Sequence, residues 1–103
     1  MANRIKLTRL DIVRYVLEKP GAYILVGAAN DAIYVGRSDT NLQRRLLEHL
    51  LGIEAKPCIA RRTPKEIYFA NTADPWAAYN LEHEWYLKYK PHCNDMVPSL
   101  PEN

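Results

Sequence analysis

An arginine and a histidine four positions apart, Arg45 and His49, are the first residues whose types and spacing could do chemistry. On a helix they would share one face, at the border of an apolar stripe that contains Leu42 and Leu46. An arginine fork matches phosphate oxygens and can stabilise the charge that develops there during phosphoryl transfer. Taken alone, such a pair is more often part of a solvated helix surface. Arg44 would lie at the opposite edge of the same stripe.

A single glutamate interrupts a second apolar stripe. Ala78, Leu81, Trp85 and Tyr89 recur at helical spacing, and Glu82 lies among them. Glutamate is rarely buried unless it is paired or binds a metal. Mg²⁺ takes oxygen ligands and keeps several waters, so one carboxylate can anchor it. The alternative is that Glu82 lies at the rim of the stripe, where it reaches water or pairs with an arginine.

Two tyrosines, Tyr23 and Tyr34, are predicted on neighbouring strands. If the turn between the strands is symmetric about Ala28 and Ala29, Tyr23 pairs directly with Tyr34 and both side chains project from one face. A cross-strand tyrosine pair is usually plain packing. Gly36, just after the second strand, would let the backbone approach a ligand or turn tightly.

The elements that must position these residues follow from periodicity and turn signals. Thr8 is available to cap a first helix, in which Leu10, Val13 and Leu17 share a stripe. Lys19-Pro20-Gly21 ends this helix. Asp39 or Thr40 is expected to cap the second helix. We predict helices over residues 9–18, 40–52 and 75–89, strands over 22–26, 32–35 and 66–70, a loop over 53–64 and an irregular segment after Asn94.

This order predicts an α+β fold, with a small three-stranded, mainly antiparallel sheet flanked by helices. A chain of 103 residues fits one domain. We expect residues 1–103 to form it, with the motifs in a core over 19–94 and an irregular tail over 95–103. Asp74 followed by Pro75 is a strong start signal for the last helix.

Composition suits a soluble globular protein, with 48% hydrophobic and 25% charged residues. No apolar run approaches the length of a membrane span, so no membrane partner is expected. The N-terminus lacks the apolar core of a secretory signal, and we expect a cytoplasmic protein. Cys58 and Cys93 could form one disulfide. A pair this far apart in a chain without a secretory signal is more often two free thiols in a reducing compartment, and this is what we predict. Residues 37–65 are basic and the segment from 74 is net acidic, which alone indicates only an ordinary solvated surface.

The order of these features resembles the GIY-YIG nuclease superfamily, closest to the N-terminal domain of UvrC or to small stand-alone members. Four elements of the sequence carry the resemblance. They are residues 19–23 (KPGAY), 33–36 (IYVG), 41–46 (NLQRRL) and 78–94 (AYNLEHEWYLKYKPHCN). Ala22 stands where isoleucine or valine is usual.

The resemblance implies a role for each matching residue. Tyr23 and Tyr34 would line the active site and bind or activate the attacking water. Glu82 would hold the metal, Mg²⁺ or Mn²⁺. His49 matches a histidine of many members, and Asn94 would brace the site.

The resemblance also implies contacts with the nucleic acid. Arg45 would contact the scissile phosphate, although counting from Tyr34 selects Arg44 instead. Arg37 follows the motif glycine and could touch phosphate. Arg61 and Arg62 lie outside the four elements that carry the resemblance, and they are predicted from their charge to bind backbone phosphates.

The function implied is that of a metal-dependent endonuclease that cuts DNA phosphodiester bonds in repair, recombination or restriction, leaving a 5′-phosphate and a 3′-hydroxyl. The alternative is a catalytically idle nucleic-acid-binding module with the same fold. A chain of this length leaves no room for a specificity domain, so we expect either a targeting protein partner or weak, structure-directed cleavage. Oligomeric state stays open.

Overall fold

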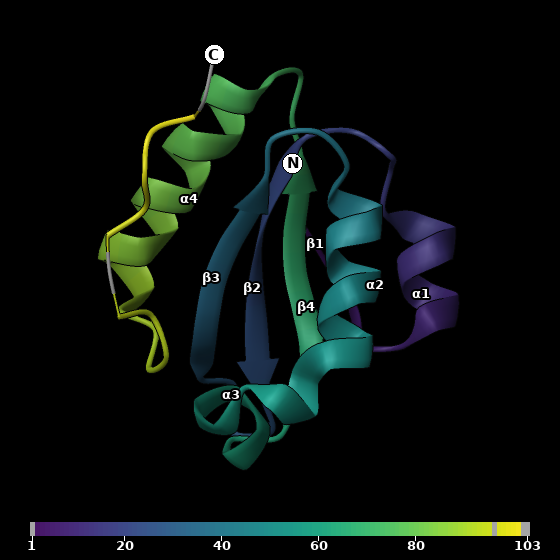
Figure 1. Cartoon of the computed structure of the whole chain (residues 1–103), viewed down its shortest axis with the longest axis vertical. Helices are drawn as coiled ribbons and strands as arrows, with labels where there is room; N and C mark the ends of the chain where they lie inside the picture. Colours follow the sequence, from purple (N-terminus) through teal and green to yellow (C-terminus); the bar gives the residue numbers. More distant parts are fainter. Residues whose placement is uncertain (1, 96, 102–103) are drawn as a thin grey trace.

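The computed structural model describes residues 2–95 and 97–101, which form one four-stranded sheet flanked by helices (Figure 1). All strand pairs are antiparallel, and the strand order is β1-β4-β2-β3. This arrangement confirms the α+β class with an antiparallel sheet. The elements are β1 (Asn3–Lys6), α1 (Arg9–Tyr15), β2 (Gly21–Gly27), β3 (Ala32–Ser38), α2 (Leu42–Gly52), the 3₁₀ helix η1 (Ile53–Ala55), α3 (Pro57–Arg61), β4 (Pro64–Asn71) and α4 (Pro75–Tyr89).

The prediction of three strands was wrong, because β1 was missed. This strand adds to the outer side of β4, with Ile5 opposite Ile67. Ile5 is its only buried residue, so four residues of sequence carry no alternating pattern that could reveal a strand. β1 and β3 are therefore the two edges of the sheet.

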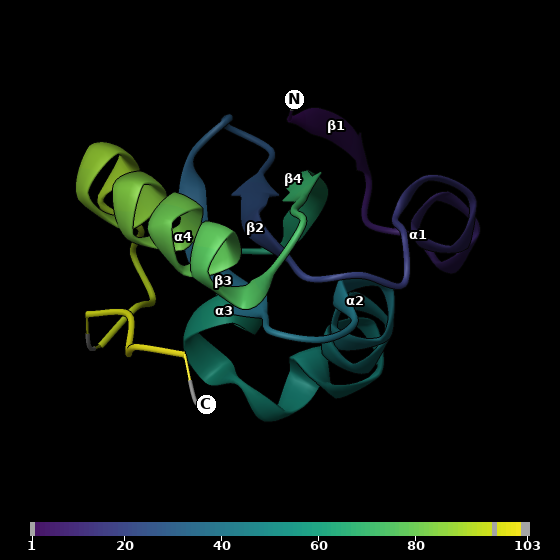
Figure 2. The same ribbon diagram turned by 90° about the horizontal axis from the view of Figure 1, so that it is seen from above.

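Helices cover both faces of the sheet (Figure 2). α1, α2 and α3 lie over one face, where Tyr23, Leu25, Leu42 and Leu46 belong to the larger apolar core. α4 lies over the other face, where Trp85 packs with the smaller core of β2 and β3. Burial of each large apolar side chain contributes roughly 1.5–3 kcal/mol. Among the helices in the described part of the chain, none is both long and apolar enough to span a membrane.

The β2–β3 hairpin is asymmetric, so the predicted pairing of Tyr23 with Tyr34 was wrong. Tyr23 lies opposite Gly36, and Tyr34 lies opposite Leu25. The pairing shifts between Leu25 and Val26, which leaves Ile33 as an extra residue on β3. A displacement of two residues keeps a side chain on the same face, so the two tyrosines are diagonal neighbours there.

The first two helices differ from prediction at their ends. α1 ends at Tyr15 and buries Ile12, while Val16 just after it is also buried. The predicted stripe of Leu10, Val13 and Leu17 is exposed, because the helix turns its other side to the sheet. Asn41, and neither Asp39 nor Thr40, caps α2 by accepting a hydrogen bond from the Arg44 amide. Its end at Gly52 was predicted.

The remaining elements follow the sequence more closely. Asp74 caps α4 and Pro75 begins it, as predicted, and the helix ends at Tyr89. β4 extends two residues before and one residue after the predicted strand. The segment 53–64, predicted as a loop, holds η1 and α3, with Pro57 at the start of α3. Proline suits the first turn of a helix, where its missing amide hydrogen is not needed.

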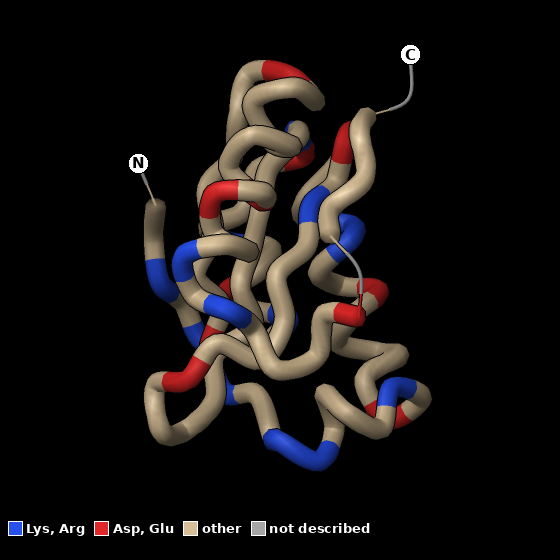
Figure 3. The backbone as a smooth tube through the Cα atoms, turned by 90° about the vertical axis from the view of Figure 1, so that its left-hand side faces the viewer, with Lys and Arg blue, Asp and Glu red and all other residues tan. Residues whose placement is uncertain are grey.

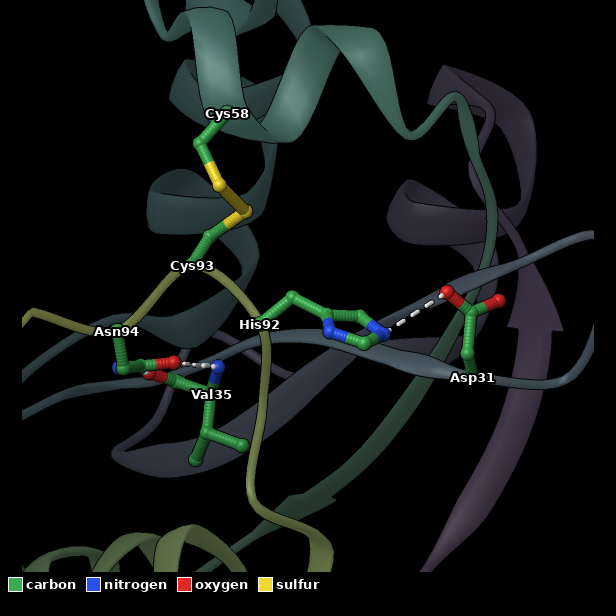
Figure 4. Close-up of a disulfide and its surroundings, with 6 residues drawn as sticks. All are labelled: Asp31, Val35, Cys58, His92, Cys93 and Asn94. Atoms are coloured by element: carbon green, nitrogen blue, oxygen red, sulfur yellow. Dashed lines mark hydrogen bonds and ion pairs between the residues drawn. A yellow bond between two sulfur atoms is a disulfide. The ribbon is translucent and has the colours of Figure 1, made fainter.

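A disulfide joins Cys58 of α3 to Cys93, so the prediction of two free thiols was wrong (Figure 4). The two residues are 35 positions apart in the sequence, and their Cα atoms are 5.8 Å apart in space. Sequence separation gave no sign of this proximity. The argument that linked free thiols to a reducing compartment therefore no longer applies.

Candidate active site

An aromatic cluster forms where α2 crosses the hairpin. The ring centroids of Tyr23 and Tyr34 are 6.2 Å apart. The His49 ring lies 5.3 Å from that of Tyr23, edge to face, and 5.5 Å from that of Tyr34. The fold thus brings three predicted site residues together. Tyr23 is fully buried, while Tyr34 is half-buried and reaches the surface.

Gly36 is the residue that allows Tyr23 its position. A Cβ atom at Gly36 would meet the Tyr23 hydroxyl oxygen and lie 2.6 Å from the Cζ atom of the ring. No side chain fits there without moving the tyrosine, so the close approach explains the glycine. The Arg45 guanidinium lies near the Tyr23 hydroxyl, but no hydrogen bond of good geometry joins them, and the hydroxyl has no other partner within the described chain. Burial raises the pKa of Tyr23 well above its ordinary value, Tyr34 adds to this, and Arg45 partly offsets it.

His49 is buried among these rings and is held neutral. Its Nδ1 and Nε2 atoms have no hydrogen-bond partner in the described part of the protein. Burial, followed by the charges of Arg45 and Lys56, lowers the pKa of His49 from 6.5 to about 4. A neutral imidazole that lacks partners costs free energy, because buried polar atoms normally form hydrogen bonds.

A charged network lies on the α4 side of β3. The Arg37 side chain donates from Nη1 to Oε1 of Glu82 at 2.6 Å and from Nε to Oδ1 of Asp39 at 2.7 Å. Glu82 is 8% exposed and therefore part of the buried stripe of α4, together with Ala78 and Trp85. Burial raises the pKa of Glu82, and the Arg37 guanidinium opposes that rise.

Asn94 holds the free edge of β3. Its Oδ1 accepts from the Val35 amide and its Nδ2 donates to the Val35 carbonyl, both at 2.8 Å (Figure 4). The amides of His92 and Cys93 donate to the carbonyls of Ala32 and Ile33 just before this point. Residues 92–94 therefore cover the outer edge of β3 with hydrogen bonds and hold it beside the cleft. The disulfide at Cys93 anchors the same segment.

One cleft connects the two sides of β3. Its lining includes five residues singled out from the sequence, namely Tyr34, Arg37, Arg45, Glu82 and Asn94. Tyr23 and His49 pack against Tyr34 and do not line the cleft themselves. Asp39 and Ser99 also line it, and sequence reasoning missed both. Asp39 had been read as a helix cap, and nothing in the pattern of Ser99 indicates proximity to the site.

The cleft offers one buried carboxylate to a metal ion. Among the residues described, no three His, Cys, Asp or Glu side chains gather closely enough to form a metal cage. A single glutamate suits Mg²⁺ better than Zn²⁺, because Mg²⁺ retains waters and needs few protein ligands. The buried Tyr23 hydroxyl, which has no protein partner, supplies further polar capacity nearby. Glu82 therefore fits the role of a magnesium ligand.

Three predicted phosphate contacts lie outside the cleft. Arg44 follows the N-terminus of α2 with its side chain exposed, one residue away from Arg45 in the cleft. Arg61 and Arg62 are exposed at the end of α3. Basic and acidic positions are interspersed along the backbone (Figure 3).

Comparison with known proteins finds matches in sequence and in fold. The model of the GIY-YIG catalytic domain matches residues 19–95. The N-terminal endonuclease domain of UvrC from Thermotoga maritima, bound to magnesium as its catalytic divalent cation, is 26% identical with a TM-score of 0.66. The match covers 81% of this chain and 94% of that one.

A point mutant of the same UvrC domain, also bound to its catalytic divalent cation, is 25% identical with a TM-score of 0.68. That match covers 82% of this chain and 96% of the other. No curated protein sequence matches the chain. Motif order, matched range and fold agree, and the chain belongs to the GIY-YIG family.

Proposed function

We propose that the chain is a divalent-metal-dependent endonuclease that hydrolyses DNA phosphodiester bonds. The observation that carries the proposal is the cleft that Glu82, a buried carboxylate, lines together with Tyr34 and Arg45. A phosphodiesterase needs a metal ligand, a cation for the phosphate and a group that accepts the proton of water. These three residues supply one of each.

Each side chain has a distinct task in this mechanism. Glu82 would hold Mg²⁺ or Mn²⁺, which polarises the phosphate and stabilises the leaving 3′ oxygen when bound. Arg45 binds the non-bridging phosphate oxygens and neutralises the charge that grows on them. We assign this task to Arg45 over Arg44 because Arg45 lines the cleft and Arg44 does not.

The two tyrosines have different roles toward the attacking water: one orients it and the other accepts its proton. Burial holds the proton on the Tyr23 hydroxyl, as the raised pKa indicates, so Tyr23 is suited to donate a hydrogen bond and to orient. Tyr34 reaches the cleft and is the residue we propose as proton acceptor. His49 stays neutral and packs against both rings, and Asn94 keeps β3 in place.

The substrate is proposed from the likeness to UvrC, whose named domain is an endonuclease. Damaged or branched DNA is the class that we propose, with targeting by a partner protein. Arg61 and Arg62 would add non-specific phosphate contacts outside the cleft.

The test is cleavage of supercoiled and branched DNA with Mg²⁺ or Mn²⁺. Three proteins are compared: the parent chain, Glu82→Gln, and Glu84→Gln, an exposed glutamate on the same helix. We expect cleavage by the parent and the Glu84 variant, and loss in the Glu82 variant with unchanged DNA binding. DNA binding without cleavage by all three proteins would favour the catalytically idle binding module. The observation that favours this alternative is the ion pair between Arg37 and Glu82, the proposed metal ligand.

A further inference from the structure

The segment Val97–Pro101, here called the covering segment, lies on the cleft. It runs beside α4 in both views of the chain (Figures 1 and 2). Val97, Pro98 and Ser99 form part of the cleft lining, together with Glu82 and Arg45. The covering segment has no regular secondary structure, so its position depends on the contacts that it makes with the cleft.

A single guanidinium links the covering segment to the proposed metal ligand. Nη1 of Arg37 donates to the Ser99 carbonyl at 2.5 Å and to Oε1 of Glu82 at 2.6 Å. The Arg37 side chain is only 10% exposed, because the covering segment and α4 lie against it. Pro101 is buried and Pro98 is half-buried, so the segment is packed at two points as well as hydrogen-bonded.

The same guanidinium stands where a cation would bind. Mg²⁺ requires the carboxylate oxygen together with room for its waters. An arginine that already donates to Oε1 of Glu82 supplies a competing positive charge at that oxygen. A cation bound at Oε1 would displace Arg37, and one bound at the other oxygen of Glu82 would lie beside the positive charge of Arg37. Arg37 therefore opposes metal binding at this carboxylate, and the Ser99 carbonyl stabilises Arg37 in that position.

The covering segment is also separate from the part of the chain that defines the catalytic domain. The family match ends at residue 95, and the segment starts two residues later. Asn94, the last residue with a structural task in the site, precedes it. The segment can therefore change position without breaking the sheet, the disulfide or the edge contact with Val35.

We propose that the covering segment is an autoinhibitory element, which holds Arg37 on Glu82 and must be displaced before metal and DNA occupy the cleft. This inference rests on the proposed function. In the closed form Arg37 neutralises Glu82. In the open form Arg37 is free to contact phosphate, the role that its position after the motif glycine suggests.

The test loosens the covering segment in the full chain. Replacing Pro98 and Pro101 together by glycine removes the packing and stiffness that hold the segment in place. Leu100→Gly is the matched control, because Leu100 lies in the same segment but is 63% exposed. Mn²⁺ affinity is measured by electron paramagnetic resonance, and the affinity for a short DNA duplex is measured separately. Thermal melting checks that every variant is folded.

We expect the loosened chain to bind Mn²⁺ more tightly by on the order of tenfold, as for a site that is open about one-tenth of the time. Leu100→Gly should bind like the parent. Equal Mn²⁺ affinity in the parent and the loosened chain would overturn the inference, and so would weaker binding, which would make the segment a support for the site. Both outcomes leave the proposed function intact if Glu82→Gln removes Mn²⁺ binding. Absence of Mn²⁺ binding and of cleavage in every variant would overturn the proposed function as well.

Discussion

The two sides of β3 are built on opposite principles. On the α2 side, Tyr23 and His49 keep three buried polar atoms without protein partners. On the α4 side, Arg37 donates hydrogen bonds to the carboxylates of Asp39 and Glu82 and to the Ser99 carbonyl. Unsatisfied buried polar atoms cost about 1–3 kcal/mol each, so the arrangement on the α2 side lowers the stability of the fold. On the α4 side, the Arg37 guanidinium and the Glu82 carboxylate are satisfied by hydrogen bonds within the chain.

This difference indicates that one side of the site is fixed by packing and that the other must rearrange before a metal binds. The aromatic side is fixed by packing against α2 and by the Gly36 contact, so it is organised before substrate arrives. The charged side must rearrange, since its carboxylate is neutralised by an arginine. Changes on the aromatic side should therefore alter the cleavage rate or the free energy of unfolding, according to the residue changed, and changes on the charged side should alter metal affinity.

The largest effect is expected from the two neighbouring arginines of α2. Arg45→Ala should lower the cleavage rate by on the order of 1,000-fold, because it removes the cation that stabilises the transition-state charge in the cleft. Arg44→Ala, the matched control on the same helix, should change the rate by less than about threefold. Single-turnover cleavage of supercoiled DNA measures both. Equal losses would remove Arg45 from its assigned role.

Loss of the disulfide should give the next largest effect, on stability. Closing a loop of 35 residues is worth about 4 kcal/mol in the chain-entropy account. Replacing both Cys58 and Cys93 by serine should lower the free energy of unfolding by an amount of this order, measured with a denaturant. A reducing agent should do the same to the parent and nothing to the double variant. If reduction leaves the parent unaffected, the bridge does not form.

The sequence predicted the elements with strong local signals and missed those that depend on distant contacts. The Asp74-Pro75 start, the end of α2 at Gly52 and the inward face of Glu82 follow from spacing alone. The β2–β3 register depends on the bulge at Ile33, and the pairing of Cys58 with Cys93 depends on how α3 packs. Neither the strand register nor the cysteine pairing can be read from a local sequence pattern.

The site shows the same division. The motif residues were found because their order along the chain is characteristic, and the fold gathers them at one cleft. Ser99 was not found as a partner of Arg37, because the two residues meet only in the folded chain. Asp39 is only two residues from Arg37, and it was missed because it had been read as a helix cap. α1 illustrates the converse error, since its regular stripe of Leu10, Val13 and Leu17 faces outward.

His49 should make stability depend on pH. Its pKa falls from 6.5 to about 4 on folding, so the unfolded chain binds the proton between these values and the folded chain does not. Stability is therefore complete above pH 6.5 and is lost as the pH falls toward 4, by about 3 kcal/mol. Denaturant unfolding at pH 7 and pH 4 measures this loss. In His49→Gln the decrease should be smaller by the same amount, and an unchanged decrease would contradict the assignment.

The two tyrosines should separate activity from stability. Tyr34→Phe should slow cleavage by on the order of 100-fold, as expected for loss of a proton acceptor. Tyr23→Phe removes a buried hydroxyl without a partner and should raise the free energy of unfolding by about 1 kcal/mol. Cleavage assays and denaturant unfolding on both variants provide the comparison. A stability loss in Tyr23→Phe would mean that its hydroxyl has a partner.

The most direct test of the account is a crystal structure of the full chain soaked with Mn²⁺, with the ion located by its anomalous signal. The account predicts one ion bound to a carboxylate oxygen of Glu82, on the side that faces Tyr34 and Arg45, with Arg37 turned away from that oxygen. Ion density at another place, or an unchanged Arg37–Glu82 pair at saturating Mn²⁺, would contradict it.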